Sequence, residues 1–549
     1  MATPTIRPRL AALAPLAAAA LLAPAAAAGD PDLYPVDVLV IEGQVVAGVG
    51  AVTSIGNLAV TNGGDWIVEV DTDNANTDTD GALLTAAGLL VQEGAALAEP
   101  AGASLDFFDS VVRNDGGRGG YNHSLDGTSG SNDDTAVYLD DDLLVQEGQL
   151  SNAAGLSLGT PYIGFFDVKV NDSDDLLVMA SVDDPAISST VDRVLVILQE
   201  DGAGNLTSET VVAKEGDVLP GQSEQVADFE TGPHNVAFND AGQVLFIADL
   251  TGDTATDHAL YRDATLLAQE GRPSPVPLRA WSSLSLAEVD LNNSGGWVVS
   301  GSLDGDAATN ALIAVNGAKL VQEGDTVQPG ATPWQLTSFG SGPVHLADNG
   351  TVLWYGVWND PDTTRNKGLF LNDRLVVQEG VTQVAGSTVD TLRGIQDGYD
   401  LSDDGQWMAF EAVLADGREG VFRIFVGPWT SLGSSLAGTG GVSPDLAGLG
   451  SLSPGALNSL EISDAAPSAL MIVVVGNTAA NVPFFLGNLV PTPTVIRYFF
   501  TNASGELTLP FVLPVIPPGF DLYVQGWIDD PGAVAGVSGT NAVLGVVQP

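Results

Sequence analysis

Short stretches of alternating apolar and polar residues, separated by turn-forming residues, run through most of the chain. In Val236/Phe238 and Val344/Leu346 the apolar residues lie two positions apart, which is the period of a strand with one buried face. Turns of Asn, Asp and Gly follow these pairs, as at residues 239–242, and such residues adopt the backbone conformations that tight hairpins need. No helical period extends over ten residues beyond the first 28, so the sequence predicts an all-β protein.

One motif, an apolar pair followed by a mostly polar residue, Glu and Gly, recurs seven times with its glycines 51 to 68 residues apart. A repeat of this length is typical of a solenoid, a propeller or an array. Because the Glu recurs once per repeat, we expect it to be structural and to accept hydrogen bonds from backbone N–H groups of the next loop. The glycines are Gly43, Gly94, Gly148, Gly216, Gly271, Gly324 and Gly380.

Each repeat is expected to contain four strands, and the last repeat has only three, ending with residues 420–425. The first copy of the motif, at residues 36–43, has no hairpins before it and can supply the missing outer strand. The prediction is a seven-bladed β-propeller over residues 33–427, closed by the N-terminal strand so that no sheet edge stays free. An open β-solenoid is the alternative, and it leaves the first copy and the short seventh repeat unexplained.

The pattern changes after Gly427. Residues 428–443 are rich in Gly and Ser and are expected to be a linker. About seven extended runs separated by Pro, Gly and Asn follow, and they predict a β-sandwich over residues 444–549.

The first 28 residues have the pattern of a signal peptide. Arg7 and Arg9 precede an Ala/Leu-rich stretch, and small residues precede Gly29. A membrane anchor is the alternative, but the stretch is short and interrupted by proline. The sequence therefore predicts export, to the extracellular space or the cell surface, with the periplasm as the alternative location.

The hairpin motif resembles a known repeat. Residues 239–246, Asn-Asp-Ala-Gly-Gln-Val-Leu-Phe, resemble the NxxGxxAF tandem repeat of bacterial exported proteins, with looser copies at residues 292–299 and 402–409. This resemblance covers about residues 33–427 and implies a β-propeller-like surface or secreted protein without implying an activity. Residues 522–526 and 539–544 resemble parts of a sandwich domain of exported planctomycete proteins. No catalytic residue is carried over from either family.

Composition narrows the function further. The 549 residues include 69 Asp and Glu but only 18 Lys and Arg, for a formal net charge of −51. Such a polyanion is not expected to bind nucleic acid or anionic membranes, because both require clustered cations. Charge repulsion favours a monomer. The absence of cysteine excludes disulfides, thiolate zinc sites and a cysteine nucleophile.

Acidic turns suggest a cation site. Asn76, Asp78 and Asp80 begin a segment that resembles an oxygen-ligand loop for Ca²⁺, but Ala87 stands at the twelfth position, where such a loop has its bidentate Glu. The alternative is a set of solvated turns, and no other cofactor is expected.

Polar residues also recur near the end of the first strand in five of the seven repeats, while Pro343 and Gly398 occupy this position in the last two. At the mouth of a central channel they would form a ring for a cation or a sugar, or simply a hydrated channel, and Asp109 and Asp167 would offer an acid and a base. His345 lies near this ring, and the ligand candidates are Asn57, Asp109, Asp167, Asn235, Glu288 and the neighbouring His234.

The second repeat departs from the pattern. Residues 117–124 should form an apolar strand but contain Arg118, Tyr121 and His123. Local failures of a pattern tend to mark functional or strained positions. The alternative is a degenerate repeat.

Repetition without a convergent catalytic set favours a secreted, non-enzymatic protein for binding, adhesion or surface scaffolding through an acidic face. Its partner would be a carbohydrate or a cell-surface component, and the sandwich would be an adhesion or display module. The alternatives are an extracellular polysaccharide hydrolase or lyase that uses channel carboxylates, and a purely structural matrix component.

Overall fold

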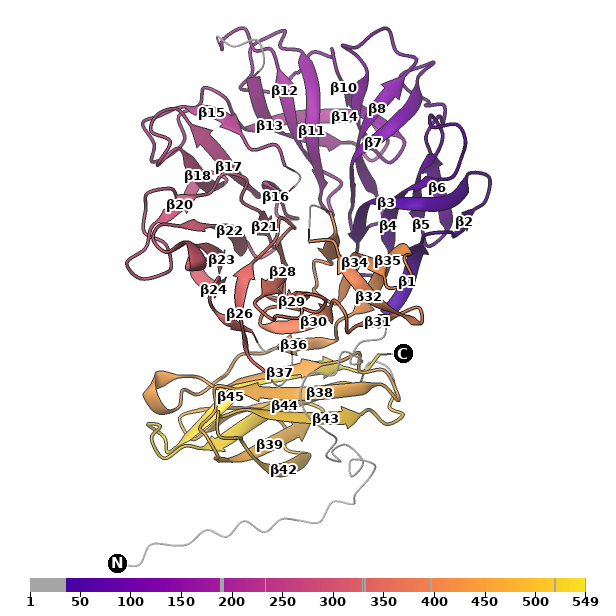
Figure 1. Cartoon of the computed structure of the whole chain (residues 1–549). Coiled ribbons are helices and arrows are strands. Elements are labelled where there is room, and N and C mark those ends of the chain that lie inside the picture. The colour runs from indigo at the N-terminus through magenta and orange to yellow at the C-terminus, as the bar shows by residue number, and fades with distance from the viewer. Residues whose placement is uncertain are drawn as a thin grey trace, which may run out of the picture. The chain divides into compact units, whose positions relative to one another are not determined.

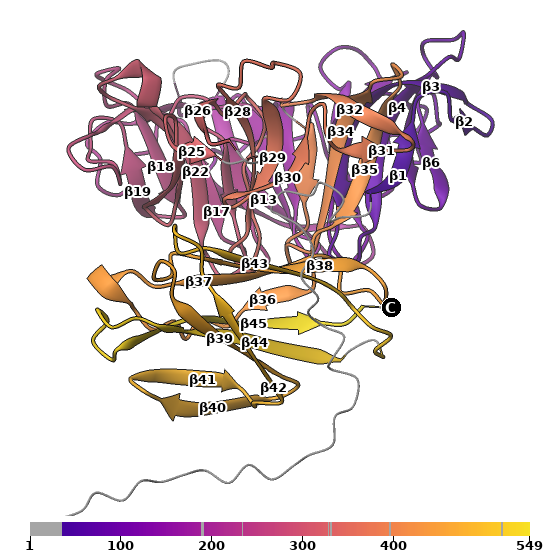
Figure 2. The ribbon, with the colours of Figure 1, turned by 60° about the horizontal axis from the view of Figure 1, so that its bottom comes forward.

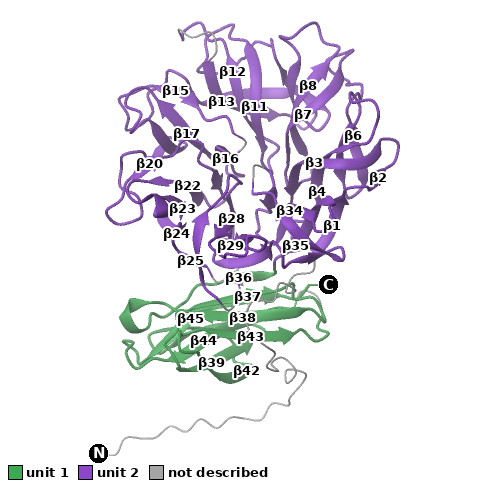
Figure 3. Ribbon diagram, in the orientation of Figure 1, with its two compact units in different colours: residues 1–33, 427–549 green, residues 34–426 purple. Residues whose placement is uncertain are grey.

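The computed structural model describes residues 36–187, 192–232, 234–327, 329, 332–394, 397–517 and 520–548. The expected signal peptide, residues 1–28, lies outside these ranges. The described part forms two compact units, one within Tyr34–Val426 and one within Gly427–Pro549, which Figure 3 shows in two colours. Strands and two short 3-10 turns, Ala307–Thr309 and Thr439–Gly441, account for its regular structure, so the expected all-β class is confirmed. No helix in the described ranges is long and apolar enough to cross a membrane.

Seven antiparallel sheets make up the first unit, and they follow one another around a ring in Figure 1. This is the propeller-like arrangement that the repeat predicts. Sheets one to three contain β2 (Val45–Val46), β3 (Gly50–Val60), β4 (Trp66–Thr72), β5 (Gly81–Thr85) and β6 (Gly88–Gln92); β7 (Ser104–Arg113), β8 (Gly119–Asp126), β9 (Thr135–Leu139) and β10 (Asp142–Gln146); and β11 (Tyr162–Val170), β12 (Leu176–Val182), β13 (Asp192–Glu200) and β14 (Leu206–Lys214).

Sheets four to seven differ in that their first strand is divided into two segments, both of which pair with the second strand. They contain β15 (Val226–Phe229), β16 (Val236–Phe238), β17 (Val244–Leu250), β18 (His258–Arg262) and β19 (Thr265–Gln269); β20 (Trp281–Ser283), β21 (Val289–Leu291), β22 (Trp297–Leu303), β23 (Ala311–Val315) and β24 (Ala318–Gln322); β25 (Thr326–Val327), β26 (Trp334–Ser338), β27 (His345–Leu346), β28 (Val352–Trp358), β29 (Lys367–Leu371) and β30 (Arg374–Gln378); and β31 (Gln383–Val384), β32 (Ser387–Leu392), β33 (Tyr399–Leu401), β34 (Trp407–Leu414) and β35 (Glu419–Phe425).

The seventh sheet is completed from the other end of the chain. Strand β1 (Val36–Ile41) pairs antiparallel with β35, with Val38 opposite Phe422 and Ile41 opposite Gly420. Val40 is fully buried in a cluster that also contains Val421 of the seventh sheet and residues of the first sheet. The pairing expected from the orphan first copy of the motif is therefore present.

Apolar clusters join successive sheets. Tyr121 packs with residues of the first and second sheets, and Val178 with the second and third. Similar clusters join the third sheet to the fourth, the fourth to the fifth and the fifth to the sixth. Because each sheet is apolar on both faces, each needs a neighbour on either side, and a ring provides one.

A ladder of turn hydrogen bonds runs around the ring. In the first six turns the second residue donates its backbone N–H to the residue at the same position in the next sheet, over 2.6–2.9 Å. The acceptor is an Asn or Asp side chain in five of these bonds and a backbone oxygen in the sixth. In the seventh turn the third residue, Asp404, closes the ladder by donating to the Asn62 side chain over 2.6 Å. The bonds run from Asn62 to Asp115, Asp115 to Asp172, Asp172 to Asp240, Asp240 to Asn293, Asn293 to Asp348 and Asp348 to Asp403.

The second unit contains a five-stranded, a three-stranded and a two-stranded sheet. One core, with Leu460 and Phe511 from the three-stranded sheet and Val473 and Val524 from the five-stranded sheet, joins the two larger sheets. Figure 2 shows β40 and β41 as a separate hairpin. The sheets are, in strand order, β36 (Trp429–Ser431), β45 (Val537–Val546), β44 (Asp521–Asp529), β39 (Leu470–Gly476) and β42 (Val495–Phe500); β37 (Asp445–Leu449), β38 (Leu457–Ser463) and β43 (Leu507–Val512); and β40 (Ala479–Phe484) with β41 (Gly487–Pro491).

The expected linker at residues 428–443 differs from the structure. Its residues 429–431 form β36, which pairs with β45, so this segment already belongs to the second unit. Composition alone hides this strand, because it is only three residues long and a Gly/Ser-rich segment follows it.

Candidate functional site

The divided first strands open a cavity in the first unit. Residues 339–344 leave the ladder between β26 and β27, and residues 284–288 do so between β20 and β21. With Asp397 from the seventh sheet they line a cavity of about 710 Å³. Its lining residues are Asn235, Leu286, Glu288, Ser300, Ile313, Phe339, Gly340, Ser341, Gly342, Pro343, Val344, Trp354, Tyr355 and Asp397.

Two of the six predicted channel residues, Asn235 and Glu288, line this cavity. Asn235 is buried and fixed, because its side chain donates to the backbone oxygen of Ala287 over 2.8 Å. His234 takes part through Asp397, with 3.0 Å between His234 Nε2 and Asp397 Oδ1. Three of the six candidates therefore lie at or next to the same cavity.

The other three predicted channel residues are not part of the cavity lining. Asn57 donates to Glu69 in the first sheet over 2.6 Å, and Asp109 accepts from Asn122 in the second sheet over 2.6 Å. Asp167 lies 3.2 Å from Lys169. Their first strands are continuous and only bulged at these positions, so these side chains are held by neighbours within or beside their own sheets.

Glu288 is the group in the cavity whose protonation is most altered. Burial raises the pKa of its carboxyl to about 8, with the charge of Asp397 adding to the effect and Lys169 opposing it. Its Oε2 is enclosed and has no hydrogen-bond partner among the described residues. At neutral pH the side chain is therefore mainly a neutral carboxylic acid.

The pKa of Asp397 is shifted in the opposite direction. Burial alone would raise its pKa, but the hydrogen bond from His234 and the positive charge of Lys169 outweigh burial and hold the pKa of this carboxyl below its ordinary value. Burial and Lys169 lower the pKa of His234, so this imidazole is mainly neutral and donates from Nε2. The cavity thus contains one protonated and one ionised carboxyl group. Asp397 belongs to no recurring motif, and sequence reasoning missed it.

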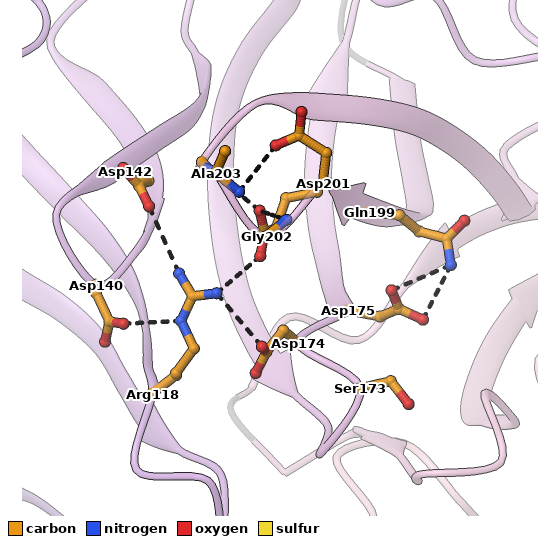
Figure 4. A network of polar contacts seen from close by, with 12 residues as sticks. Arg118, Asp140, Asp142, Ser173, Asp174, Asp175, Gln199, Asp201, Gly202 and Ala203 are labelled. Atoms are coloured by element: carbon orange, nitrogen blue, oxygen red, sulfur yellow. Dashed lines mark hydrogen bonds and ion pairs between the residues drawn. The ribbon is translucent and has the colours of Figure 1, made fainter.

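The unusual residues of the second repeat do not form one site. Arg118 links the second and third sheets through four carboxylates, lying 2.8 Å from Asp140 and 2.7 Å from Glu200, with Asp142 and Asp174 at 3.5 and 3.4 Å (Figure 4). Its role is to hold two sheets together.

Tyr121 and His123 lie instead in the core of the second sheet. Their rings stack with centroids 5.0 Å apart, and Phe108 packs against His123 edge-on at 5.5 Å. Burial lowers the pKa of His123 to about 3, so this imidazole is neutral. The expected alternative, a degenerate repeat, accounts for these contacts.

The recurring Glu is structural, but only two copies accept the expected bond from the next loop: Glu270 accepts from Leu284 N over 2.7 Å and Glu379 from Leu392 N over 2.9 Å. Most of the other copies accept instead from a backbone N–H at the start of the third strand of their own sheet, as Glu93 does from Gly81 over 2.8 Å. The Gln before the Glu has a matching role, since Gln92 Nε2 donates to Thr79 O over 2.6 Å. These residues join the outer part of each sheet to its turns and leave no free carboxylate for chemistry.

Asp78 and Asp80 lie in the turn between β4 and β5, where Asp78 is exposed. Potential metal-ligand atoms converge elsewhere: those of Asp249, Asp257 and His258 in the fourth sheet lie within 4.8 Å of one another. His258 already contacts carboxylates through both ring nitrogens, Nε2 with Glu230 at 3.1 Å and Nδ1 with Asp257 at 3.0 Å.

In two other sheets, the position equivalent to His258 is occupied by a basic residue, Arg or Lys. The backbone oxygen that accepts the N–H of the recurring Glu belongs to Arg193 in the third sheet, His258 in the fourth and Lys367 in the sixth. Hydrogen bonding to Glu230 and the charges around it raise the pKa of His258 to about 9. His258 is therefore an imidazolium that replaces Arg or Lys in a recurring structural position.

One protein-family profile matches part of the repeat region. The profile of a family of unknown function (DUF7453) matches residues 75–263, which run from the second hairpin of the first sheet into the fourth sheet. No curated protein matches. Among solved structures, the chain is similar to the Penicillium chrysogenum alpha-L-arabinanase complexed with arabinobiose, at 12% identity and a TM-score of 0.28, over 57% of this chain and 91% of that one.

The chain is also similar to a second solved structure, a tetra-tandem repeat in the extending region of a large adhesion protein. The identity is 10% and the TM-score 0.12, over 93% of this chain and 98% of that one. At these identities and TM-scores, neither structure indicates a ligand or an activity for this chain. The function proposed below is based on the geometry of the cavity.

Proposed function

We propose that residues 36–425 form a seven-bladed β-propeller closed by β1, and that residues 444–549 with β36 form a β-sandwich. Support for the propeller comes from the seven successive sheets, the pairing of β1 with β35, and the ladder of turn bonds that returns from Asp404 to Asn62. Support for the sandwich comes from the single core between the two larger sheets of the second unit.

We further propose that the protein is exported and binds a carbohydrate in the cavity between the fifth and sixth sheets. The cavity volume, about 710 Å³, is within the range of small-ligand sites. Phe339 contributes aromatic surface, backed by the almost fully buried rings of Trp354 and Tyr355, and Ser300 and Ser341 contribute hydroxyl groups. Sugars present apolar ring faces and hydroxyl edges, so this mixture of aromatic and polar groups suits them. The cavity is the observation that carries the proposal.

Titration calorimetry with oligosaccharides of laminarin, xylan and arabinan tests the binding. Ser341 is exposed and lines the cavity, so Ser341→Trp is expected to fill it and to weaken binding at least about tenfold, a loss of about 1.4 kcal/mol. Ser504→Trp, in an exposed turn of the second unit, is the matched control and should bind as the unchanged protein does. Binding to none of these sugars, or equal binding by Ser341→Trp, would contradict the proposal.

The alternative function, a polysaccharide hydrolase or lyase, requires two carboxyl groups that face one cavity. Asp109 and Asp167 do not meet this requirement, because neither lines the cavity. Glu288 and Asp397 meet it, because both line the cavity.

A further inference from the structure

Glu288 and Asp397 reach the cavity from two different sheets, and each is held in place. The backbone N–H of Glu288 donates to Ser300 Oγ over 2.9 Å, and Ser300 N donates back to the Glu288 carbonyl over 2.9 Å. These two hydrogen bonds to β22 fix the backbone from which the Glu288 side chain extends. Oε2 of that side chain has no hydrogen-bond partner among the described residues. A buried polar atom left without a partner is costly, and most of all when it carries charge, which favours the neutral, protonated form of this carboxyl group.

Asp397 is oriented by a neutral imidazole. Its Oδ1 lies 3.0 Å from His234 Nε2, and His234 in turn packs edge-on against His345 with centroids 5.8 Å apart. One carboxylate oxygen, Oδ1, is thus engaged by His234, and among the described residues no other side chain donates a hydrogen bond to this carboxyl group. The second oxygen is available to a water molecule in the cavity.

We propose that this cavity hydrolyses glycosidic bonds of an uncharged polysaccharide, with Glu288 as the general acid and Asp397 as the general base. The inference rests on the proposed carbohydrate binding and adds an activity to it. Anionic polysaccharides are disfavoured as substrates because Asp397 is ionised in the cavity and the chain carries a formal charge of −51.

The step balances with water as the only co-reactant. Water attacks the anomeric carbon and gives one proton to Asp397 as the new C–O bond forms. The bond from the anomeric carbon to the leaving oxygen breaks with its electron pair, and Glu288 donates its proton to that oxygen. Afterwards Asp397 loses its proton to solvent and Glu288 regains one, so both groups return to their starting states.

The protonation states of the two groups agree with these roles. The titratable and charged groups that interact with Glu288 are Asp397, Lys169 and Tyr399, and those that interact with Asp397 are Glu288, His234, Lys169, His345 and Asp167. Together with burial they leave Glu288 protonated up to about pH 8 and Asp397 ionised across the neutral range. Two carboxyl groups whose pKa values are separated by their surroundings are a common acid–base arrangement in hydrolases. Activity is therefore expected to fall as the pH rises through about 8.

The test measures release of new reducing ends from laminarin, xylan and arabinan by the full chain, with polygalacturonate and alginate as anionic comparisons. We expect Glu288→Gln and Asp397→Asn each to lower the rate on the uncharged substrate about 10²–10⁴-fold. Glu69→Gln is the matched control: Glu69 is a half-buried glutamate whose pKa burial raises to about 7, it lies in the first sheet, and it does not line the cavity. This control should retain full activity.

Calorimetry separates the two proposals. Glu288→Gln should still bind the oligosaccharide, since its amide keeps the shape and polarity of the acid, and its melting temperature should match that of the unchanged protein. Binding without any release of reducing ends by the unchanged protein would overturn the hydrolase inference and leave the binding function standing. Rates unaffected by either substitution, or hydrolysis of the anionic glycans alone, would also overturn it.

Discussion

At the scale of single residues, most polar side chains that recur in this chain serve the backbone. Gln92 and Glu270 bond to main-chain groups of turns and loops, and Asn239 Nδ2 donates to the backbone oxygen of Asn292 in the next sheet over 2.9 Å. The first Asn of the hairpin motif is therefore a link between neighbouring sheets. A residue that recurs once per repeat makes the same structural contact in successive sheets. Its recurrence therefore indicated a structural role and not a catalytic one.

His258 gives a pH prediction at this scale. Its pKa of about 9 in the folded chain exceeds the 6.5 of an unperturbed imidazole, so its stabilising charge is fully present below pH 6.5 and is lost as the pH rises through about 9. His258→Gln should lower the free energy of unfolding by about 1.5–3 kcal/mol at pH 6, as expected for lost hydrogen bonds to charged groups, and by much less at pH 10. Denaturant unfolding at both pH values measures this.

His258→Lys is the control, because Lys367 occupies the same position in the sixth sheet. A lysine should keep the stabilisation at pH 10, where histidine has lost it. An equal deficit of His258→Gln at both pH values would show that the charge of His258 does not contribute.

At the scale of elements, the hairpin pattern predicted the strands of each repeat but not the division of the first strand in sheets four to seven. The strand expected from the alternation of Val344 and Leu346 is only His345–Leu346, and residues 339–344 before it line the cavity. Alternation of apolar residues shows where a strand can form. It does not show where the backbone leaves the ladder, because that depends on what the neighbouring sheets leave unfilled.

The closing strand supplies the prediction for this scale. Val40 is fully buried whereas Val38 is 43% exposed, although both lie in β1. Val40→Ala should lower the free energy of unfolding by roughly 2 kcal/mol through lost apolar contacts and a residual cavity. Val38→Ala should change it by less than about 0.5 kcal/mol. Thermal or urea unfolding of the two variants compares them, and equal effects would mean that β1 does not seal the core between the seventh and first sheets.

At the scale of the whole molecule, a formal charge of −51 acts on a fold whose carboxylates are brought close together by the ring of turns. Asp115, Asp172, Asp240 and Asp403 line one cavity of about 100 Å³ with Arg113. Like charges so arranged oppose the compact state, and dissolved salt screens them.

The melting temperature is therefore expected to rise between about 10 and 150 mM NaCl, as the screening length falls from about 30 to 8 Å. Differential scanning fluorimetry measures it. Comparison with CaCl₂ at equal ionic strength tests for a Ca²⁺ site in the acidic turns: an additional, saturating rise would support a site at residues such as Asp78 and Asp80, and equal curves would remove it. A melting temperature that falls or stays constant with NaCl would contradict the role given to charge repulsion.

The sequence by itself determined the all-β class, the number of repeats and the pairing of residues 36–41 with the last sheet, because period, turn chemistry and motif count are local properties that one chain displays directly. It also indicated Asn235, Glu288 and His234. Only the tertiary structure decided that Asp109 and Asp167 do not line the cavity and that Asp397 does, since a cavity is formed by side chains whose positions depend on the packing of several sheets at once. Burial raises the pKa of Glu288 and neighbouring groups lower that of Asp397, so one carboxyl group is protonated and the other ionised at neutral pH. Neither effect can be read from the order of residues in the sequence.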